Sequence, residues 1–185
     1  MESMSRERGL FVFLNSIEIF GVLLVLFLAS IFQFLDHELP CPLCLLQRAG
    51  FIAISTGLLF NLRFGPRSAH YSLVLLSALL TALIALRQIA LHIVPGTGHY
   101  GNPVFGFHLY TWVFIISLCV LVYTAIILAF DVQYEKIQSK MTTRKTFMHF
   151  CFILVLAMTA INVVSVFVEC GWKQCPDNPT RYLEI

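Results

Sequence analysis

Two pairs of cysteines are the residues of this sequence best suited to chemistry. Cys41 and Cys44 are separated by two residues in the stretch ELPCPLCLLQR, and Cys170 and Cys175 are separated by four in ECGWKQC. Closely spaced cysteines serve as redox-active disulfides, as structural clips or as metal ligands. The compartment that the sulfur atoms face and the groups around them decide among these uses.

The first pair is predicted to lie at the start of a helix. Pro42 suits the first helical turn, where its missing N–H costs nothing, so Cys41 would be the N-cap and Cys44 would lie in the first turn. The free N–H groups and the positive end of the helix dipole stabilise a thiolate there. Arg48 lies on the same face, about 6 Å deeper than Cys44, and is predicted to stabilise this thiolate and a neighbouring anion or carbonyl. Snorkelling of Arg48 to lipid head groups is the alternative.

Other uses of the four sulfur atoms remain open. The c-type haem signature is excluded, because Leu45 stands where that signature requires histidine. We predict no metal site, but four thiolates binding zinc remain an alternative, provided that they survive in an oxidising compartment. A disulfide between Cys170 and Cys175 would close a small loop and stabilise the fold only modestly, which favours an exchangeable disulfide over a staple. Lys173 between the two sulfurs would favour thiolate formation.

The rest of the sequence is suited to lipid. Of its 185 residues 58% are hydrophobic and 12% are charged, against about 25% charged in soluble domains. Five apolar runs are long enough for the hydrocarbon core, which takes ~20 residues, and each is predicted to be a helix because backbone groups in lipid must bond internally. The runs cover approximately residues 9–35, 43–62, 71–94, 105–130 and 146–168.

Lysine and arginine residues outside these runs predict the orientation. Eight lie on the side of the N-terminus and two lie in the C-terminal tail, so we expect a cytoplasmic N-terminus and, after five spans, a C-terminus on the outer side. Both cysteine pairs would then face one oxidising compartment, in which disulfides persist. The net charge of +2 and the lack of a basic stripe argue against nucleic-acid binding.

The predicted fold is all-α: a polytopic membrane protein in which a fifth transmembrane helix joins a four-helix bundle. We expect a single membrane domain over residues 1–185, with a redox tail at 169–185. Cys119 and Cys151 lie inside the fourth and fifth runs, and we expect both to act as small buried hydrophobic side chains.

At PCPLCLLQR the sequence resembles the disulfide bond formation protein B (DsbB) family of inner-membrane quinone reductases. The resemblance covers the first four spans: a helix, the Cys-x-x-Cys, a helix with an arginine four residues on, and a hairpin of two more helices. The segment ALRQIALH at the end of the third run resembles that family's third helix. The position of the dithiol, after the first span, separates this chain from the vitamin K epoxide reductases.

The resemblance implies a route for electrons in a bacterial inner (cytoplasmic) membrane. A periplasmic thioredoxin-fold thiol oxidase of the DsbA type would reduce a mobile cysteine pair, which would reduce Cys41–Cys44. Cys44 would then reduce ubiquinone or menaquinone from the membrane pool beside Arg48. In that family the mobile pair lies between the third and fourth spans, but this loop has no cysteine here. We predict that Cys170 and Cys175 in the periplasmic tail replace it.

Two further residues of the third run are predicted to contact quinone oxygens. They are Arg87, a charge inside an apolar run, and His92, which can also move a proton. Pairing of Arg87 with a carbonyl or an acid, and an interfacial position for His92, are the alternatives. The predicted function is a thiol–disulfide oxidoreductase that reoxidises the periplasmic oxidase and delivers electrons to quinone. A non-enzymatic membrane protein with metal-binding or structural cysteines is the alternative, as is the same pathway run in reverse.

Overall fold

The protein forms five helices in the computed structural model, which describes residues 2–35, 39–94, 96, 103–130, 142–173 and 175. The helices are α1 (Glu2–Leu35), α2 (Pro42–Phe64), α3 (Ser68–His92), α4 (Leu109–Leu128) and α5 (Thr142–Cys170). Each contains a stretch long and apolar enough to cross a membrane, which confirms the predicted all-α fold with five spans. Most of the linker at 131–145 and the tail beyond Cys175 lie outside the described residues.

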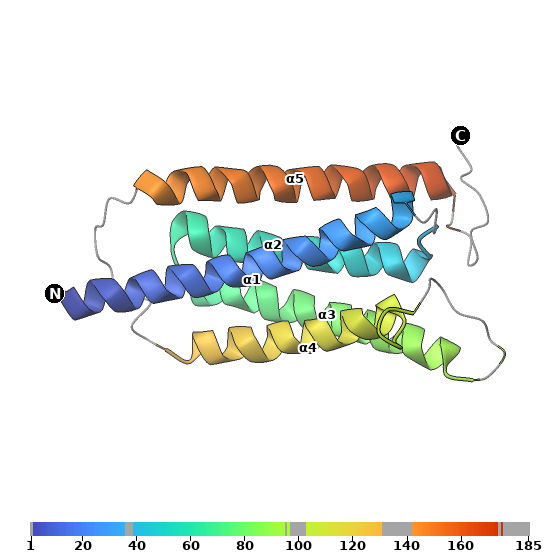
Figure 1. Ribbon diagram of the computed structural model, residues 1–185, viewed down its shortest axis with the longest axis horizontal. Helices are drawn as coiled ribbons and strands as arrows, with labels where there is room; N and C mark the ends of the chain where they lie inside the picture. The colour runs from blue at the N-terminus through green and yellow to red at the C-terminus, as the bar shows by residue number, and fades with distance from the viewer. Residues whose placement is uncertain are drawn as a thin grey trace.

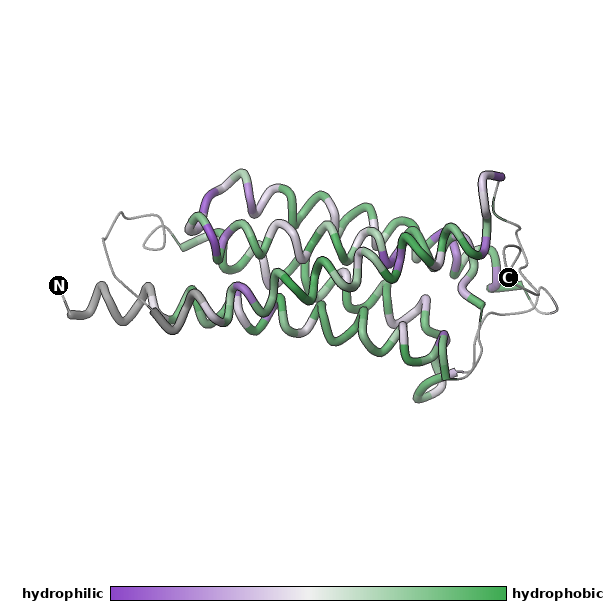
Figure 2. The backbone as a smooth tube through the Cα atoms, turned by 90° about the horizontal axis from the view of Figure 1, so that it is seen from above, coloured by the Kyte–Doolittle hydropathy of each residue, from purple (hydrophilic) through white to green (hydrophobic). Residues whose placement is uncertain are grey.

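The helices run side by side, with α5 at one edge and with α3 and α4 at the other (Figure 1). Helix α3 packs against both α2 and α4, whereas α5 packs on α1 and α2. The start of α2 and the end of α5 lie at the same end of the bundle, opposite the N-terminus. Hydrophobic residues cover most of the length of the helices, and hydrophilic residues gather mainly toward the two ends (Figure 2). The arrangement brings the two cysteine pairs to one end of the molecule.

Helices α2 and α3 approach each other closely because glycines of α2 lie in their interface. A Cβ added to Gly57 would lie 2.7 Å from Val74 Cγ2, and one added to Gly50 would lie 2.0 Å from Thr81 Oγ1. Absence of these side chains lets the two backbones come together, as small residues do between membrane helices. In this antiparallel register the start of α2 meets the end of α3.

One seam of α5 faces α1 and α2. Its buried residues recur at alternating intervals of three and four, the spacing of one helix face. The half toward the start of α5 is largely apolar and the half toward its end is polar. The seam consists of Met148, Cys151, Val155, Met158, Asn162, Ser165 and Glu169.

The two cysteines outside the pairs differ in their surroundings. Cys151 is 2% exposed and belongs to the hydrophobic core, as predicted. Cys119 is exposed on α4, so its predicted burial is wrong. An apolar run in a membrane helix has no polar face to show which of its residues point outward, because lipid and core favour the same side chains.

Replacing Gly50 with alanine is expected to destabilise the protein, because the added Cβ would overlap Thr81 and force α2 and α3 apart. Overpacking of a filled interface lowers the free energy of unfolding by about 1–3 kcal/mol. The matched control is Gly21→Ala in α1, where an added Cβ meets no atom within 4 Å. Thermal unfolding in detergent should show a lower melting temperature for Gly50→Ala alone. Equal melting temperatures for the two variants would contradict the close contact.

Candidate functional site

The first cysteine pair forms the N-terminal cap of α2. Cys41 has extended backbone angles, its Sγ accepts a hydrogen bond from the N–H of Cys44 at 3.1 Å, and its carbonyl oxygen accepts one from Leu45 at 3.1 Å. Pro42 occupies the first helical position. The predicted cap is therefore confirmed, and Cys41 and Cys44 are joined in a disulfide. Both sulfur atoms lie where the free N–H groups of the helix favour negative charge.

A buried amide of α3 lies against this disulfide. The Nε2 of Gln88 is 3.1 Å from Cys41 Sγ and 3.5 Å from Cys44 Sγ. Its Oε1 accepts a hydrogen bond from Gln47 Nε2 at 2.7 Å, and Gln88 is 0% exposed. Gln88 was not among the sequence-predicted residues. The signal for it is its spacing of seven from Thr81, which places both residues on the face of α3 that meets α2.

Arg48 belongs to a hydrogen-bond network that joins three helices. Its Nη1 donates to Gln33 Oε1 of α1, and its Nη2 donates to the carbonyl oxygen of Ala29 at 2.8 Å. Gln33 in turn donates to Ser165 Oγ of α5 at 3.2 Å. Gln33 and Ser165 are both buried. The guanidinium is therefore bound between α1 and α2, one helical turn below Cys44.

A carboxyl group of α5 belongs to the same region. Glu169 is 0% exposed, and its side chain interacts electrostatically with Arg48. Within the described part of the chain, neither of its carboxylate oxygens has a hydrogen-bond partner. The sequence analysis did not predict Glu169 as a site residue. Two features could have indicated it: its heptad spacing from Asn162 on the seam of α5 and its position directly before Cys170.

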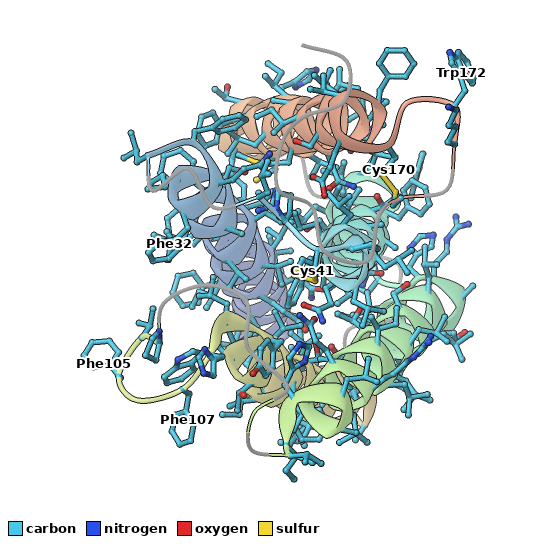
Figure 3. The ribbon with its side chains drawn as sticks, turned by 90° about the vertical axis from the view of Figure 1, so that its right-hand side faces the viewer. Phe32, Cys41, Phe105, Phe107, Cys170 and Trp172 are labelled. Atoms are coloured by element: carbon cyan, nitrogen blue, oxygen red, sulfur yellow. A yellow bond between two sulfur atoms is a disulfide. The ribbon has the colours of Figure 1, made fainter. Side chains whose placement is uncertain are left out.

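The second cysteine pair closes the end of α5. Cys170 is the last helical residue, and Gly171 follows with a φ of 57°, a left-handed conformation that suits glycine and ends the helix. Cys170 and Cys175 form a disulfide. Cys170 is 3% exposed and Cys175 is half-buried. In the view onto this end of the bundle, Cys41 lies near the centre, Cys170 lies at the end of α5, and Trp172 points away from the helices (Figure 3).

Arg87 and His92 occupy different positions relative to the disulfide. Arg87 is exposed on α3 and is not among the residues around the sulfur atoms. His92 is half-buried, with its Nδ1 2.8 Å from the backbone oxygen of Gln88 and its ring stacked on Tyr110 at 5.5 Å between centroids. The quinone-binding roles of both residues stay predictions. Among the described residues, no three His, Cys, Asp or Glu side chains are grouped to hold a metal ion.

Replacing Gln88 with methionine should make the Cys41–Cys44 disulfide harder to reduce. The amide N–H stabilises thiolates more than disulfide sulfurs, and hydrogen bonds to charged groups contribute about 1.5–3 kcal/mol. For a two-electron couple this corresponds to a potential lower by about 30–60 mV. The control is Arg87→Met, the neighbouring exposed position. Redox titration in glutathione or dithiothreitol buffers, read by alkylation of Cys41 and Cys44, measures both; equal potentials would contradict the role of Gln88.

Comparisons with known proteins identify relatives of the first part of the chain. The model of the family described as disulfide bond formation protein DsbB matches residues 12–100. The chain is 38% identical to a disulfide bond formation protein B of Nitrosomonas eutropha (strain DSM 101675 / C91 / Nm57) over 60 residues, which are 30% of this chain and 37% of that relative. No solved structure matches the chain. Residues 12–100, the segment with Cys41, Cys44, Arg48 and Gln88, are therefore similar to the DsbB family, the resemblance that the Cys-x-x-Cys stretch predicted.

Proposed function

We propose that the protein is a thiol–disulfide oxidoreductase of the bacterial inner membrane, which reoxidises a periplasmic DsbA-like thioredoxin-fold oxidase and passes the electrons to membrane quinone. The observation that carries the proposal is the Cys41–Cys44 disulfide at the start of a membrane-type helix, inside the segment similar to DsbB. The Cys170–Cys175 disulfide at the same end of the bundle is the point at which electrons enter.

The exposure of the sulfur-bearing residues suggests the order of exchanges. A partner thiolate attacks Cys175, which is more exposed than Cys170, and Cys170 leaves as the thiolate. The second thiol of the partner then releases Cys175, so the partner becomes oxidised and the tail pair becomes a dithiol. The tail pair transfers two electrons and two protons to Cys41–Cys44 and becomes a disulfide again. Each exchange proceeds through a mixed disulfide.

Cys44 is the electron donor that the geometry favours. It is half-buried, whereas Cys41 is 2% exposed, and Leu46 nearby is 53% exposed on the membrane-facing surface of α2. The partly buried guanidinium of Arg48 provides hydrogen-bond donors for a carbonyl oxygen. Polar donors beside an apolar, lipid-accessible surface fit ubiquinone or menaquinone. When bound, quinone accepts two electrons and two protons and becomes quinol.

The side chains around Cys44 have distinct tasks in this proposal. Gln88 donates to both sulfurs and stabilises the thiolate that leaves when the disulfide opens. Further along α3, His92 would exchange protons with the quinone, and Arg87 would contact it from the exposed face of the helix. The zinc alternative requires four free thiolates, whereas the four sulfurs form two disulfides.

Replacing Cys44 with serine should abolish quinone reduction by thiols. Purified protein in detergent is mixed with a ubiquinone or menaquinone analogue and a reduced thioredoxin-fold substrate, and quinone loss is followed by ultraviolet absorbance. The control is Cys119→Ser, which removes an exposed cysteine of α4 and should leave the rate unchanged. Absence of turnover in the wild type with both quinones and several substrates would contradict the proposal, and stoichiometric zinc in that protein would favour the metal-binding alternative.

The tail cysteines should form the contact with the partner. A partner with only its attacking cysteine is expected to form a stable mixed disulfide with the Cys170→Ser variant through Cys175, and much less with Cys175→Ser, because Cys170 is buried. Non-reducing electrophoresis and peptide mapping detect the product. A Cys170→Ser, Cys175→Ser double variant that still oxidises the partner at the wild-type rate would overturn the assignment.

A further inference from the structure

Glu169 is a buried carboxyl group to which the proposed route assigns no task. It is 0% exposed, and neither of its oxygens has a hydrogen-bond partner among the residues that the structure describes. Burial of a polar group without a partner is unfavourable. Acidic residues inside membrane segments are rare and often belong to proton relays. The position of Glu169 therefore needs a functional explanation.

The groups near this carboxyl, a guanidinium and a cysteine, indicate its function. On one side it interacts electrostatically with Arg48, whose guanidinium is fixed by Gln33 and the backbone of Ala29. In the chain it directly precedes Cys170, which is also buried at the end of α5. Burial opposes the charged form of a carboxyl and a nearby guanidinium supports it, so such a group can hold either protonation state.

We propose that Glu169 is the proton acceptor and donor of the exchange between the two cysteine pairs. This rests on the proposed function only in assuming that the tail pair reduces Cys41–Cys44. Glu169 lies on α5, beyond the segment similar to DsbB, so it accompanies the relocated cysteine pair and not the Cys-x-x-Cys itself.

The exchange balances with Glu169 as an intermediate proton carrier. The Cys170 thiol gives its proton to the carboxylate, and its sulfur forms a bond with Cys41 as the Cys41–Cys44 bond breaks. The leaving sulfur of Cys44 takes the proton back from Glu169. Cys175 then attacks Cys170 in the mixed disulfide, and its proton passes to Cys41 in the same way. Two electrons and two protons move from the tail pair to the α2 pair, and Glu169 ends unchanged.

Few other charged or titratable groups lie on the described parts of the elements around Glu169. Among the described residues, α2 contributes Arg48 and the two cysteines, the end of α5 contributes Cys170 and Lys173, and α1 contributes the neutral amide of Gln33. Arginine keeps its proton at all accessible pH values. Lys173 is exposed. Of these groups, Glu169 is the buried carboxyl, and a carboxylate is able to take a proton from a thiol.

The test measures the internal transfer in full-length protein freed of quinone, without a partner. Oxidised protein is mixed with one equivalent of dithiothreitol, quenched with acid at intervals, alkylated, and analysed by mass spectrometry for label at each cysteine pair. Glu169→Gln should slow the transfer of reduction from the tail pair to Cys41–Cys44 by about 100-fold at pH 6.5, within the range of general acid–base catalysis. The difference should vanish near pH 9, above the usual thiol pKa of about 8.5.

Three further proteins make the result decisive. Glu18→Gln, which removes another buried carboxyl on α1, should transfer at the wild-type rate. Glu169→Asp should keep the wild-type pH profile, and it carries the test if Glu169→Gln fails to form both disulfides. The Cys170→Ser, Cys175→Ser variant measures direct reduction of Cys41–Cys44 by dithiothreitol, which is subtracted.

A wild-type rate in Glu169→Gln at every pH would overturn the inference. A rate lowered by one constant factor from pH 6 to pH 9 would also overturn it, because that is the effect of a structural role. A Glu169→Asp profile without pH dependence would do the same. Absence of transfer in the wild type itself would instead contradict the proposed electron route, so the two failures are distinguishable.

Discussion

A guanidinium inside a membrane-embedded bundle must be surrounded by polar groups, because charge in an apolar medium is strongly unfavourable. Arg48 meets this requirement with groups from α1 and α5: Gln33, the backbone of Ala29 and the carboxyl of Glu169. Ser165 extends the network by accepting from Gln33. Through Gln33 and Ser165, this network joins α5 to α1 and α2 at the end of the bundle that carries both disulfides.

The second constraint is the close packing of α2 and α3. With Gly57 opposite Val74 and Gly50 opposite Thr81, an antiparallel pair of helices must place the start of α2 opposite Gln88. The amide then reaches both sulfurs of the cap, while Gln47 satisfies its oxygen. Small residues in the middle of the membrane thus determine which polar side chain lies beside the disulfide.

Sequence reasoning succeeded where one element alone decides the structure. Hydropathy predicts five helices because each run must bond internally in lipid, and Pro42 predicts the cap because its ring suits only the first turn. It missed residues whose position depends on how two helices cross. Arg87 is the more conspicuous residue, but the neighbouring Gln88 faces the disulfide, since one position along a helix rotates the side chain by about 100°. The burial of Glu169 likewise depends on how α5 packs.

Each cysteine pair contains one buried residue and one more exposed residue, and this asymmetry separates the exchanges. Cys41 and Cys170 are 2% and 3% exposed, while Cys44 and Cys175 are half-buried. Cys170 is the last residue of α5. Cys175 follows it by five residues, a length of chain that can reach at most about 17 Å. In the proposed route the two half-buried sulfurs would meet the external reactants, a protein thiol at Cys175 and a lipid-soluble acceptor at Cys44. In the same route the buried sulfurs of Cys41 and Cys170 would exchange with each other away from water, and a thiol proton would then need an internal acceptor such as the one proposed at Glu169.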